Sequence, residues 1–184
     1  MPAPSPIRNV AVFCASADGS NPLYRNAAVE LGQALATRGI GLIYGGARVG
    51  LMHAVAESAL AHGGRVVGII PEVLVNLEVA HTGLSELHVT STMHTRKALM
   101  GERSDAFIAL PGGFDTLEEL FEVLAWQTLK LHAKPIILIN THGFYDQLLA
   151  FLDHCVDEGM LKSRSRPILQ VASTVDEALR LINL

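Results

Sequence analysis

The chain has 184 residues, of which 49% are hydrophobic and 17% charged, and its formal net charge is −4 at pH 7. This composition is typical of one globular domain; it excludes a disordered chain, and the negative charge argues against nucleic acid as a partner. Two cysteines are too few for a disulfide framework, and no apolar run reaches the roughly 18 residues of a membrane span. We expect a single cytoplasmic domain over residues 1–184 that binds no membrane, with residues 1–6 as a flexible Pro-rich tail.

Short apolar segments alternate with amphipathic segments along the whole chain. The apolar segments are rich in Val and Ile, which favours parallel strands covered on both faces. We predict strands at residues 10–14, 41–44, 66–70, 87–90, 106–110, 136–139 and 168–171. We predict helices between them at residues 23–38, 50–62, 93–104, 116–130, 145–158 and 174–182.

Strands that alternate with helices predict an α/β fold, here a Rossmann-like doubly wound and mainly parallel sheet flanked by helices on both faces. Ligands of such sheets bind at the carboxyl ends of the strands. Three glycine-containing turns follow predicted strands, at residues 14–20, 44–50 and 110–116. We therefore expect the three turns to gather around one cleft.

The second turn, Tyr-Gly-Gly-Ala-Arg-Val-Gly, contains Gly45 and Gly46. It is not a P-loop, because Leu-Met follows where Lys-Ser or Lys-Thr is required. It nearly matches the dinucleotide fingerprint, with Glu72 about where a ribose-binding acid would stand, but Ala47 replaces the middle glycine. We interpret it as a phosphate-facing turn, with a tight turn of no binding role and a nicotinamide enzyme as the alternatives.

The third turn lies in Leu-Pro-Gly-Gly-Phe-Asp-Thr-Leu-Glu-Glu, residues 110–119. Gly112 and Gly113 let the backbone approach a ligand closely. The helix that follows directs unpaired N–H groups and the positive end of its dipole at the same place, which suits a phosphate. Glu118 and Glu119 then bring carboxylates beside this anion site, as an enzyme acting on a nucleotide would need.

Glu119 also has a structural explanation. Thr116-Leu117-Glu118-Glu119 matches a capping box, in which Glu119 would accept a hydrogen bond from the Thr116 amide. Asp115 with Glu118 offers the same pattern one residue earlier. The residues alone favour capping and catalysis equally.

Arg96 and Lys97 lie near the start of a predicted helix. Consecutive helical residues project about 100° apart, so at most one of the two side chains can point squarely into a cleft. The alternative is a solvated basic face, although cations are unfavourable near a helix N-terminus unless something such as a bound phosphate offsets them. His53 and His94 have no second ligand at a metal-binding spacing, so we expect no metal site.

Together these segments resemble the LOG (Lonely Guy) family of cytokinin riboside 5′-monophosphate phosphoribohydrolases, formerly mislabelled as lysine decarboxylases. The family motif PGGxGTxxE is matched from Pro111 to Glu119 except at Asp115. Its Met-His-x-Arg-Lys element resembles residues 93–97, and its Tyr-Gly-Gly-Gly-x-x-Gly-Leu-Met turn resembles residues 44–52. The likeness extends over nearly the whole chain.

The resemblance implies hydrolysis of the N-glycosidic bond of a purine nucleoside monophosphate, with Arg96 and Glu119 as the catalytic pair and with no metal or organic cofactor. It also implies a homodimer or larger homo-oligomer, with helices 93–104 and 116–130 near the contact. The apolar residues that we expect on these two helices near the contact are Met100, Leu124 and Trp126. Substrate contacts are implied for the other motif residues, which are Gly45, Gly46, Glu78, Lys97, Gly112, Gly113, Phe114, Asp115, Thr116, Leu117 and Glu118.

The implied chemistry agrees with the residue types. Breaking the C1′–N bond builds positive charge on the ribose, which a carboxylate stabilises. We expect Arg96 to hold Glu119 by a bidentate pair and to keep it ionised near neutral pH. The alternative function is a catalytically weak protein that senses or carries AMP-like ligands, and the sequence does not choose between AMP and a prenylated purine.

Two residues depart from the family pattern, because Asp115 and Ala47 replace glycines. A carboxylate directed at a phosphate would repel it. We therefore expect Asp115 to turn outward and cap the helix that follows.

Overall fold

The computed structural model describes residues 6–75, 77 and 80–184 of the chain. It contains a seven-stranded sheet in the order β4-β3-β2-β1-β5-β6-β7, in which every pairing is parallel. The strands are β1 Asn9–Phe13, β2 Gly41–Tyr44, β3 Val66–Pro71, β4 Glu86–Thr90, β5 Ala106–Ala109, β6 Ile136–Ile139 and β7 Leu169–Ala172. The helices are α1 Pro22–Thr37, α2 Gly50–Ala61, α3 Glu72–Val75, α4 Met93–Arg103, α5 Phe114–Thr128, α6 Asp146–Asp157 and α7 Val175–Leu181, with 3-10 helices η1 Thr141–Gly143 and η2 Ser163–Ile168.

The predicted Rossmann-like fold is confirmed. Each predicted strand and helix is present, with shifts of one or two residues at its ends. The sequence did not predict α3, η1 and η2, because elements of three to six residues are too short to show a periodic pattern. None of the described helices is long and apolar enough to cross a membrane.

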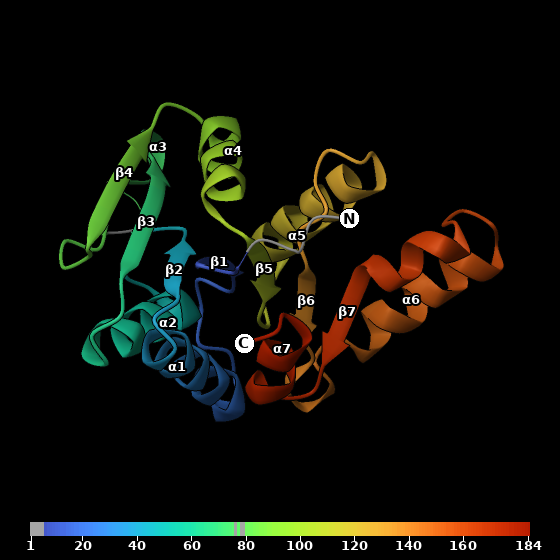
Figure 1. The fold of residues 1–184 in the computed structure, drawn as a ribbon, viewed down its shortest axis with the longest axis horizontal. Helices are drawn as coiled ribbons and strands as arrows, with labels where there is room; N and C mark the ends of the chain where they lie inside the picture. Colours follow the sequence, from blue (N-terminus) through green and yellow to red (C-terminus); the bar gives the residue numbers. More distant parts are fainter. Residues whose placement is uncertain (1–5, 76, 78–79) are drawn as a thin grey trace.

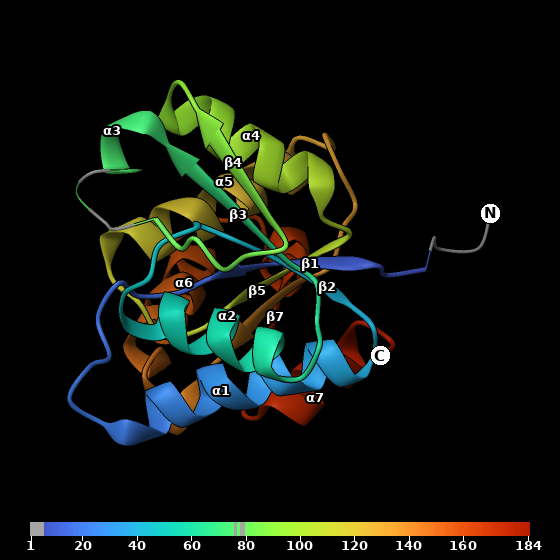
Figure 2. The ribbon, with the colours of Figure 1, turned by 90° about the vertical axis from the view of Figure 1, so that its left-hand side faces the viewer.

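Helices cover both faces of the sheet (Figures 1 and 2). Helices α1, α2 and α7 bury apolar side chains against one face, and α4, α5 and α6 bury theirs against the other. The strands between these layers are almost entirely apolar and buried, with the two edge strands β4 and β7 excepted. Burial on both faces explains why the strand segments read as continuous apolar runs rather than as alternating ones.

The strand order reverses at the centre of the sheet. From β1 the chain adds β2, β3 and β4 on one side, then returns to place β5 against the other side of β1 and adds β6 and β7. The connections after β1 and β5 therefore leave toward opposite faces of the sheet. They open a crevice beyond the carboxyl ends of these two strands, where α/β sheets of this kind bind ligands.

Helix α5 begins earlier than the sequence predicted. Its N-cap is Gly113, which makes no side-chain capping hydrogen bond, and the Leu117 N–H donates to the Gly113 carbonyl at 2.9 Å. Thr116 is thus already inside the first turn, so the predicted capping box between Thr116 and Glu119 is wrong. Glu119 is left free for another role.

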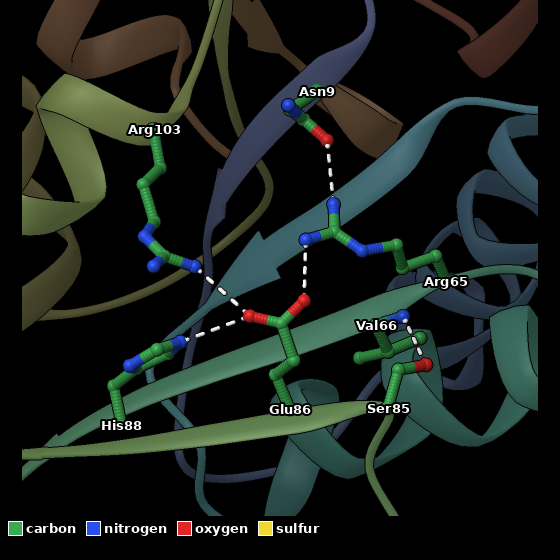
Figure 3. Close-up of polar contacts among 7 residues, drawn as sticks. All are labelled: Asn9, Arg65, Val66, Ser85, Glu86, His88 and Arg103. Atoms are coloured by element: carbon green, nitrogen blue, oxygen red, sulfur yellow. Dashed lines mark hydrogen bonds and ion pairs between the residues drawn. The ribbon is translucent and has the colours of Figure 1, made fainter.

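A network of charged side chains ties the edge of the sheet to α4 (Figure 3). Glu86, the first residue of β4, accepts hydrogen bonds from Arg65 at 2.5 Å and from Arg103 at 3.0 Å, and the His88 Nε2 lies 3.0 Å from it. Arg103 is the last residue of α4, and Arg65 also donates to Asn9 on β1. The hydrogen bond from Arg65, with those from His88 and Arg103, lowers the pKa of Glu86 to about 2.

This network predicts a specific acid sensitivity. Because the folded-state pKa of Glu86 lies below its ordinary value of 4.5, its charge stabilises the fold above pH 4.5, and the stabilisation disappears as the pH falls toward 2. Glu86→Gln should therefore lower the midpoint of thermal unfolding at pH 7, with a difference that shrinks in acid and in high salt. The control is Glu30→Gln, on the exposed face of α1, which should show neither effect. Equal stability of Glu86→Gln and wild type at pH 7 would contradict this account.

Candidate active site

A cavity of about 500 Å³ lies beyond the carboxyl ends of β1, β2 and β5, at the reversal of strand order. All three predicted glycine turns contribute to its wall, which confirms that they gather around one cleft. The lining residues are Val12, Cys14, Ala15, Ser16, Ala17, Gly45, Met52, Leu74, Met93, Arg96, Gly113, Asp115, Thr116, Glu118 and Glu119.

Arg96 enters the cavity from the first turns of α4. A reciprocal capping box between Thr92 and Thr95 fixes the start of this helix. The guanidinium is almost fully buried, and its Nε donates to the Ile69 carbonyl at 3.1 Å. Because this hydrogen bond fixes the orientation of the side chain, the charge of Arg96 sits at a defined point in the cavity wall.

Gly45 makes room for Arg96. A Cβ atom placed on Gly45 would clash with the Arg96 Nη2 and with the Met52 Cε. Arg96 is not free to move away, because it is buried and its Nε is bound to the Ile69 carbonyl. The sequence assigned this glycine to a turn that faces phosphate, and it missed this second role. Only the fold brings Gly45 and Arg96 together, so no local pattern could have revealed it.

Glu119 faces Arg96 from α5. Its Oε1 lies 3.3 Å from the Arg96 Nη2, and both side chains are less than 10% exposed. The contact lacks hydrogen-bond geometry, and Oε1 accepts no hydrogen bond from the described residues. The predicted pair between the two residues is present, but as one contact and not as a bidentate pair.

Burial decides the charge of Glu119. Loss of hydration raises its pKa to about 7, although the Arg96 charge acts in the opposite direction; the charges of Glu118 and Asp115 raise it further. The expectation that Arg96 keeps Glu119 ionised is therefore wrong, because desolvation outweighs the single contact. A carboxyl that gains and loses its proton near neutral pH suits acid–base catalysis.

Lys97 lies outside the cavity lining. Its buried Nζ donates to Glu118 and lies 3.1 Å from a Glu122 oxygen, so it joins α4 to α5. Its pKa is raised by these carboxylates, although burial acts in the opposite direction. The structure confirms that only one of the two consecutive cations, Arg96, points into the cleft.

The remaining motif residues divide between the cavity and its surroundings. Gly113, Thr116 and Glu118 line it, whereas Gly112 lines a smaller neighbouring cavity together with Gly113. Three other predicted contacts lie elsewhere: Gly46 has a positive φ and packs on β3, Phe114 is 92% exposed, and Leu117 packs against the core on the α5 face. The predicted contact Glu78 is outside the described residues.

Apolar side chains complete the wall, and the sequence did not single them out. Met52 comes from α2, Leu74 from α3 and Met93 from the first turn of α4. Met52 follows the second glycine turn by two residues, whereas Leu74 and Met93 belong to segments that are distant in sequence from the glycine turns. Of the three helices that carry these side chains, the sequence predicted α2 and α4 but not α3, which is too short to show a helical period.

Asp115 belongs to the cavity as well. It is the second residue of α5, it lines the cavity, and its charge contributes to the raised pKa of Glu119. The expectation that Asp115 caps the helix is wrong, because Gly113 holds the N-cap position and no side chain makes a capping hydrogen bond there. Asp115 is an exposed residue at the rim of the cavity. This chain therefore has a carboxylate where the family motif has glycine.

A second cluster of polar side chains lies on α2. The structure brings potential ligand atoms of His53, Glu57 and His81 within 4.8 Å of one another, so the expectation that His53 has no second ligand is wrong. However, the Gly83 N–H donates to the His81 Nδ1 at 3.1 Å, and the His81 Nε2 lies 2.7 Å from Glu57. A ring that accepts at Nδ1 carries its proton on Nε2, which leaves no lone pair for a metal ion.

Comparison with known proteins places this site in a family. The family model described as "Possible lysine decarboxylase" matches residues 52–182. The cytokinin riboside 5′-monophosphate phosphoribohydrolase LOG2 of Arabidopsis thaliana is 45% identical over 178 residues, which cover 97% of this chain and 84% of that protein. The probable phosphoribohydrolase LOGL2 of Oryza sativa subsp. japonica is 46% identical over 175 residues, or 95% of this chain and 72% of that protein. The chain belongs to the LOG family.

Solved structures support the LOG-family fold. The molybdenum cofactor binding protein of Rippkaea orientalis is 26% identical with a TM-score of 0.72, and the match covers 95% of this chain and 94% of that one. The molybdenum cofactor carrier protein of Chlamydomonas reinhardtii is 21% identical with a TM-score of 0.68, over 94% of both chains. The second likeness bears on the fold alone.

The buried Glu119 carboxyl should make the free energy of unfolding depend on pH. Because the folded-state pKa of Glu119 lies above 4.5, folding favours the protonated form, and stability falls as the pH rises from 4.5 to about 7. Glu119→Gln removes this loss, so relative to wild type its free energy of unfolding should improve by about 2.5 kcal/mol between pH 5 and pH 8. Urea unfolding at both pH values measures this difference.

Glu30→Gln serves as the control for this measurement, since its side chain is exposed. The attraction between Arg96 and ionised Glu119 is already contained in the pKa of Glu119, so the pH dependence reports burial and the Arg96 charge together. Only the packing and hydrogen-bonding changes of Glu119→Gln that do not depend on ionisation cancel in the comparison. Identical pH dependence in Glu119→Gln and wild type would contradict the raised pKa.

Proposed function

We propose that this chain hydrolyses the N-glycosidic bond of purine riboside 5′-monophosphates and releases the free base and ribose 5-phosphate. LOG-family relatives over most of the chain carry the name cytokinin riboside 5′-monophosphate phosphoribohydrolase. The observation that carries the proposal is the buried contact between Arg96 and Glu119 in the wall of the cavity. The reaction needs a carboxyl that can gain and lose a proton near neutral pH, and a cation at a fixed position beside it.

The proposed reaction uses Glu119 twice. As the C1′–N bond breaks, its electron pair moves to the base and positive charge develops on the ribose, which the Glu119 carboxylate stabilises. Water adds to C1′ and gives a proton to Glu119, and this proton then passes to the departing base, which returns Glu119 to the carboxylate. Arg96 holds Glu119 in place and keeps a fixed positive charge beside it.

The start of α5 is the proposed phosphate site. The N–H groups of Phe114, Asp115 and Thr116 occupy the first helical turn, where the helix itself offers no acceptor. Together with the positive end of the helix dipole they favour an anion. A sugar held between this turn and Glu119 would present its C1′ to the carboxyl.

A second function is a binding protein that keeps the fold without hydrolysis and carries an AMP-like ligand. The likeness to the molybdenum cofactor binding protein of Rippkaea orientalis, which is 26% identical, favours this alternative. Release of free base from AMP or from isopentenyladenosine monophosphate distinguishes the two. A protein that binds these nucleotides but releases no base would be the carrier.

The catalytic pair gives the next prediction. Glu119→Ala and Arg96→Ala should each reduce turnover by ~100-fold or more while the protein stays folded, because each removes charge that acts on the transition state. Wild-type turnover should fall as the pH drops below about 7, since the base form of Glu119 is then lost. Glu30→Ala is the control, and chromatography of the released base is the measurement. Full activity of a stable Glu119→Ala protein would return this residue to a structural role.

We also propose a cytoplasmic homodimer or larger homo-oligomer. Of the three residues offered by the sequence, Met100 is fully buried, and Leu124 and Trp126 pack against the core on the α5 face. The exposed apolar side chains of this face are different ones, among them Phe121 on α5 and Phe151 on α6. We therefore propose that Phe121 and Phe151, in place of the buried Met100, form the contact between protomers.

Light scattering at micromolar concentration should give at least twice the mass of one protomer, and Phe121→Lys should lower it because a charge would be buried in the contact. Leu23→Lys is the control: Leu23 is apolar and similarly exposed, but it lies on α1 at the opposite face of the sheet. A monomeric wild type would contradict the assembly.

A further inference from the structure

The catalytic cavity has an unusual balance of charge. Its described lining contains three acidic side chains, Asp115, Glu118 and Glu119, and one cation, Arg96. The Arg96 guanidinium is already engaged by the Ile69 carbonyl and by Glu119. Acidic side chains of the described wall therefore outnumber its one cation, which already neutralises part of their charge, before a phosphate with a charge of roughly −1.5 to −2 enters.

Asp115 is the carboxylate that most affects an incoming anion. Glu118 is bound to Lys97 and Glu119 lies beside Arg96, whereas Asp115 forms no ion pair with any described residue. It occupies the second position of α5, in the same turn whose N–H groups form the proposed anion site. Its negative charge and a bound phosphate would thus both lie at the positive end of the α5 dipole, where they repel each other.

A carboxylate treats a phosphate and a hydroxyl in opposite ways. It repels a phosphate, but it accepts a strong hydrogen bond from a hydroxyl group. Dinucleotide-binding folds use this difference, since an acidic residue selects the ribose hydroxyl and an arginine accommodates the phosphorylated form. Asp115, in the place of the family glycine, therefore makes this part of the cavity more favourable for a hydroxyl group and less favourable for a phosphate.

We propose that Asp115 binds the 5′-hydroxyl of a purine riboside, so that this protein hydrolyses ribosides that lack the 5′-phosphate in addition to the monophosphates. The inference rests on the proposed function, because the same pair, Arg96 and Glu119, performs the chemistry. Water adds to C1′, the C1′–N bond breaks with its electron pair on the base, and one proton passes to the base. The products are the free base and ribose.

The test compares two substrates, N6-isopentenyladenosine and its 5′-monophosphate, by the release of free base. Wild type should cleave both. In Asp115→Asn, which keeps the size of the side chain and removes its charge, kcat/KM for the monophosphate should rise relative to the riboside by about tenfold, equivalent to ~1.4 kcal/mol. The change should lie mainly in KM for the monophosphate and should shrink in high salt.

The chain offers a closely matched control. Asp176 is also the second residue of a helix, α7, with its N-cap at Thr174, and it lies outside the cavity lining. Asp176→Asn removes the same charge from the same helical position and should leave the ratio of the two substrates unchanged. Asp115→Gly restores the family residue and should move the ratio in the same direction as Asp115→Asn.

Each outcome decides the inference. Turnover of the monophosphate without turnover of the riboside by wild type overturns it and leaves the proposed function standing. An unchanged ratio in both Asp115 variants also overturns it. If wild type releases base from neither substrate, the proposed function fails and this inference fails with it. If the variants do not fold, riboside turnover by wild type alone decides.

Discussion

The buried contact between Arg96 and Glu119 is the interaction on which the rest of the site depends. The two residues come from α4 and α5, which cover the same face of the sheet, and they meet where the strand order reverses. Burying an ion pair costs hydration energy that one contact of 3.3 Å does not fully return. The cost appears in the raised pKa of Glu119, which gives the carboxyl a proton equilibrium near neutrality.

Two further constraints fix this contact. Lys97 binds Glu118 and Glu122, so consecutive cations on α4 meet acidic residues on α5 in a fixed register. This register turns Arg96 toward the cavity and Lys97 away from it. At the other end of α4, Arg103 joins Glu86 at the sheet edge. The helix that carries Arg96 is thus held at both ends by charge and in the middle by packing.

Much of the fold could be predicted from the sequence, because the strand segments inside the sheet are almost entirely apolar and glycines mark helix ends. The catalytic pair could be predicted only with the family resemblance, since the Thr116–Glu119 segment alone favoured a capping box equally. The start of α5 was misplaced because Gly113 caps the helix without a side chain. The steric need for Gly45, the pKa of Glu119 and the place of Asp115 at the cavity depend on contacts between distant segments, which no local pattern contains.

The central claim is that burial beside Arg96 holds the Glu119 carboxyl near the midpoint of its titration at neutral pH. Carbon-13 NMR of protein labelled at the glutamate carboxyl carbons tests it most directly, with the Glu119 signal assigned by its disappearance in Glu119→Gln. The account predicts that this signal titrates with a midpoint near pH 7. A midpoint at or below the ordinary value of 4.5 would show that Arg96 outweighs burial, and it would contradict the account.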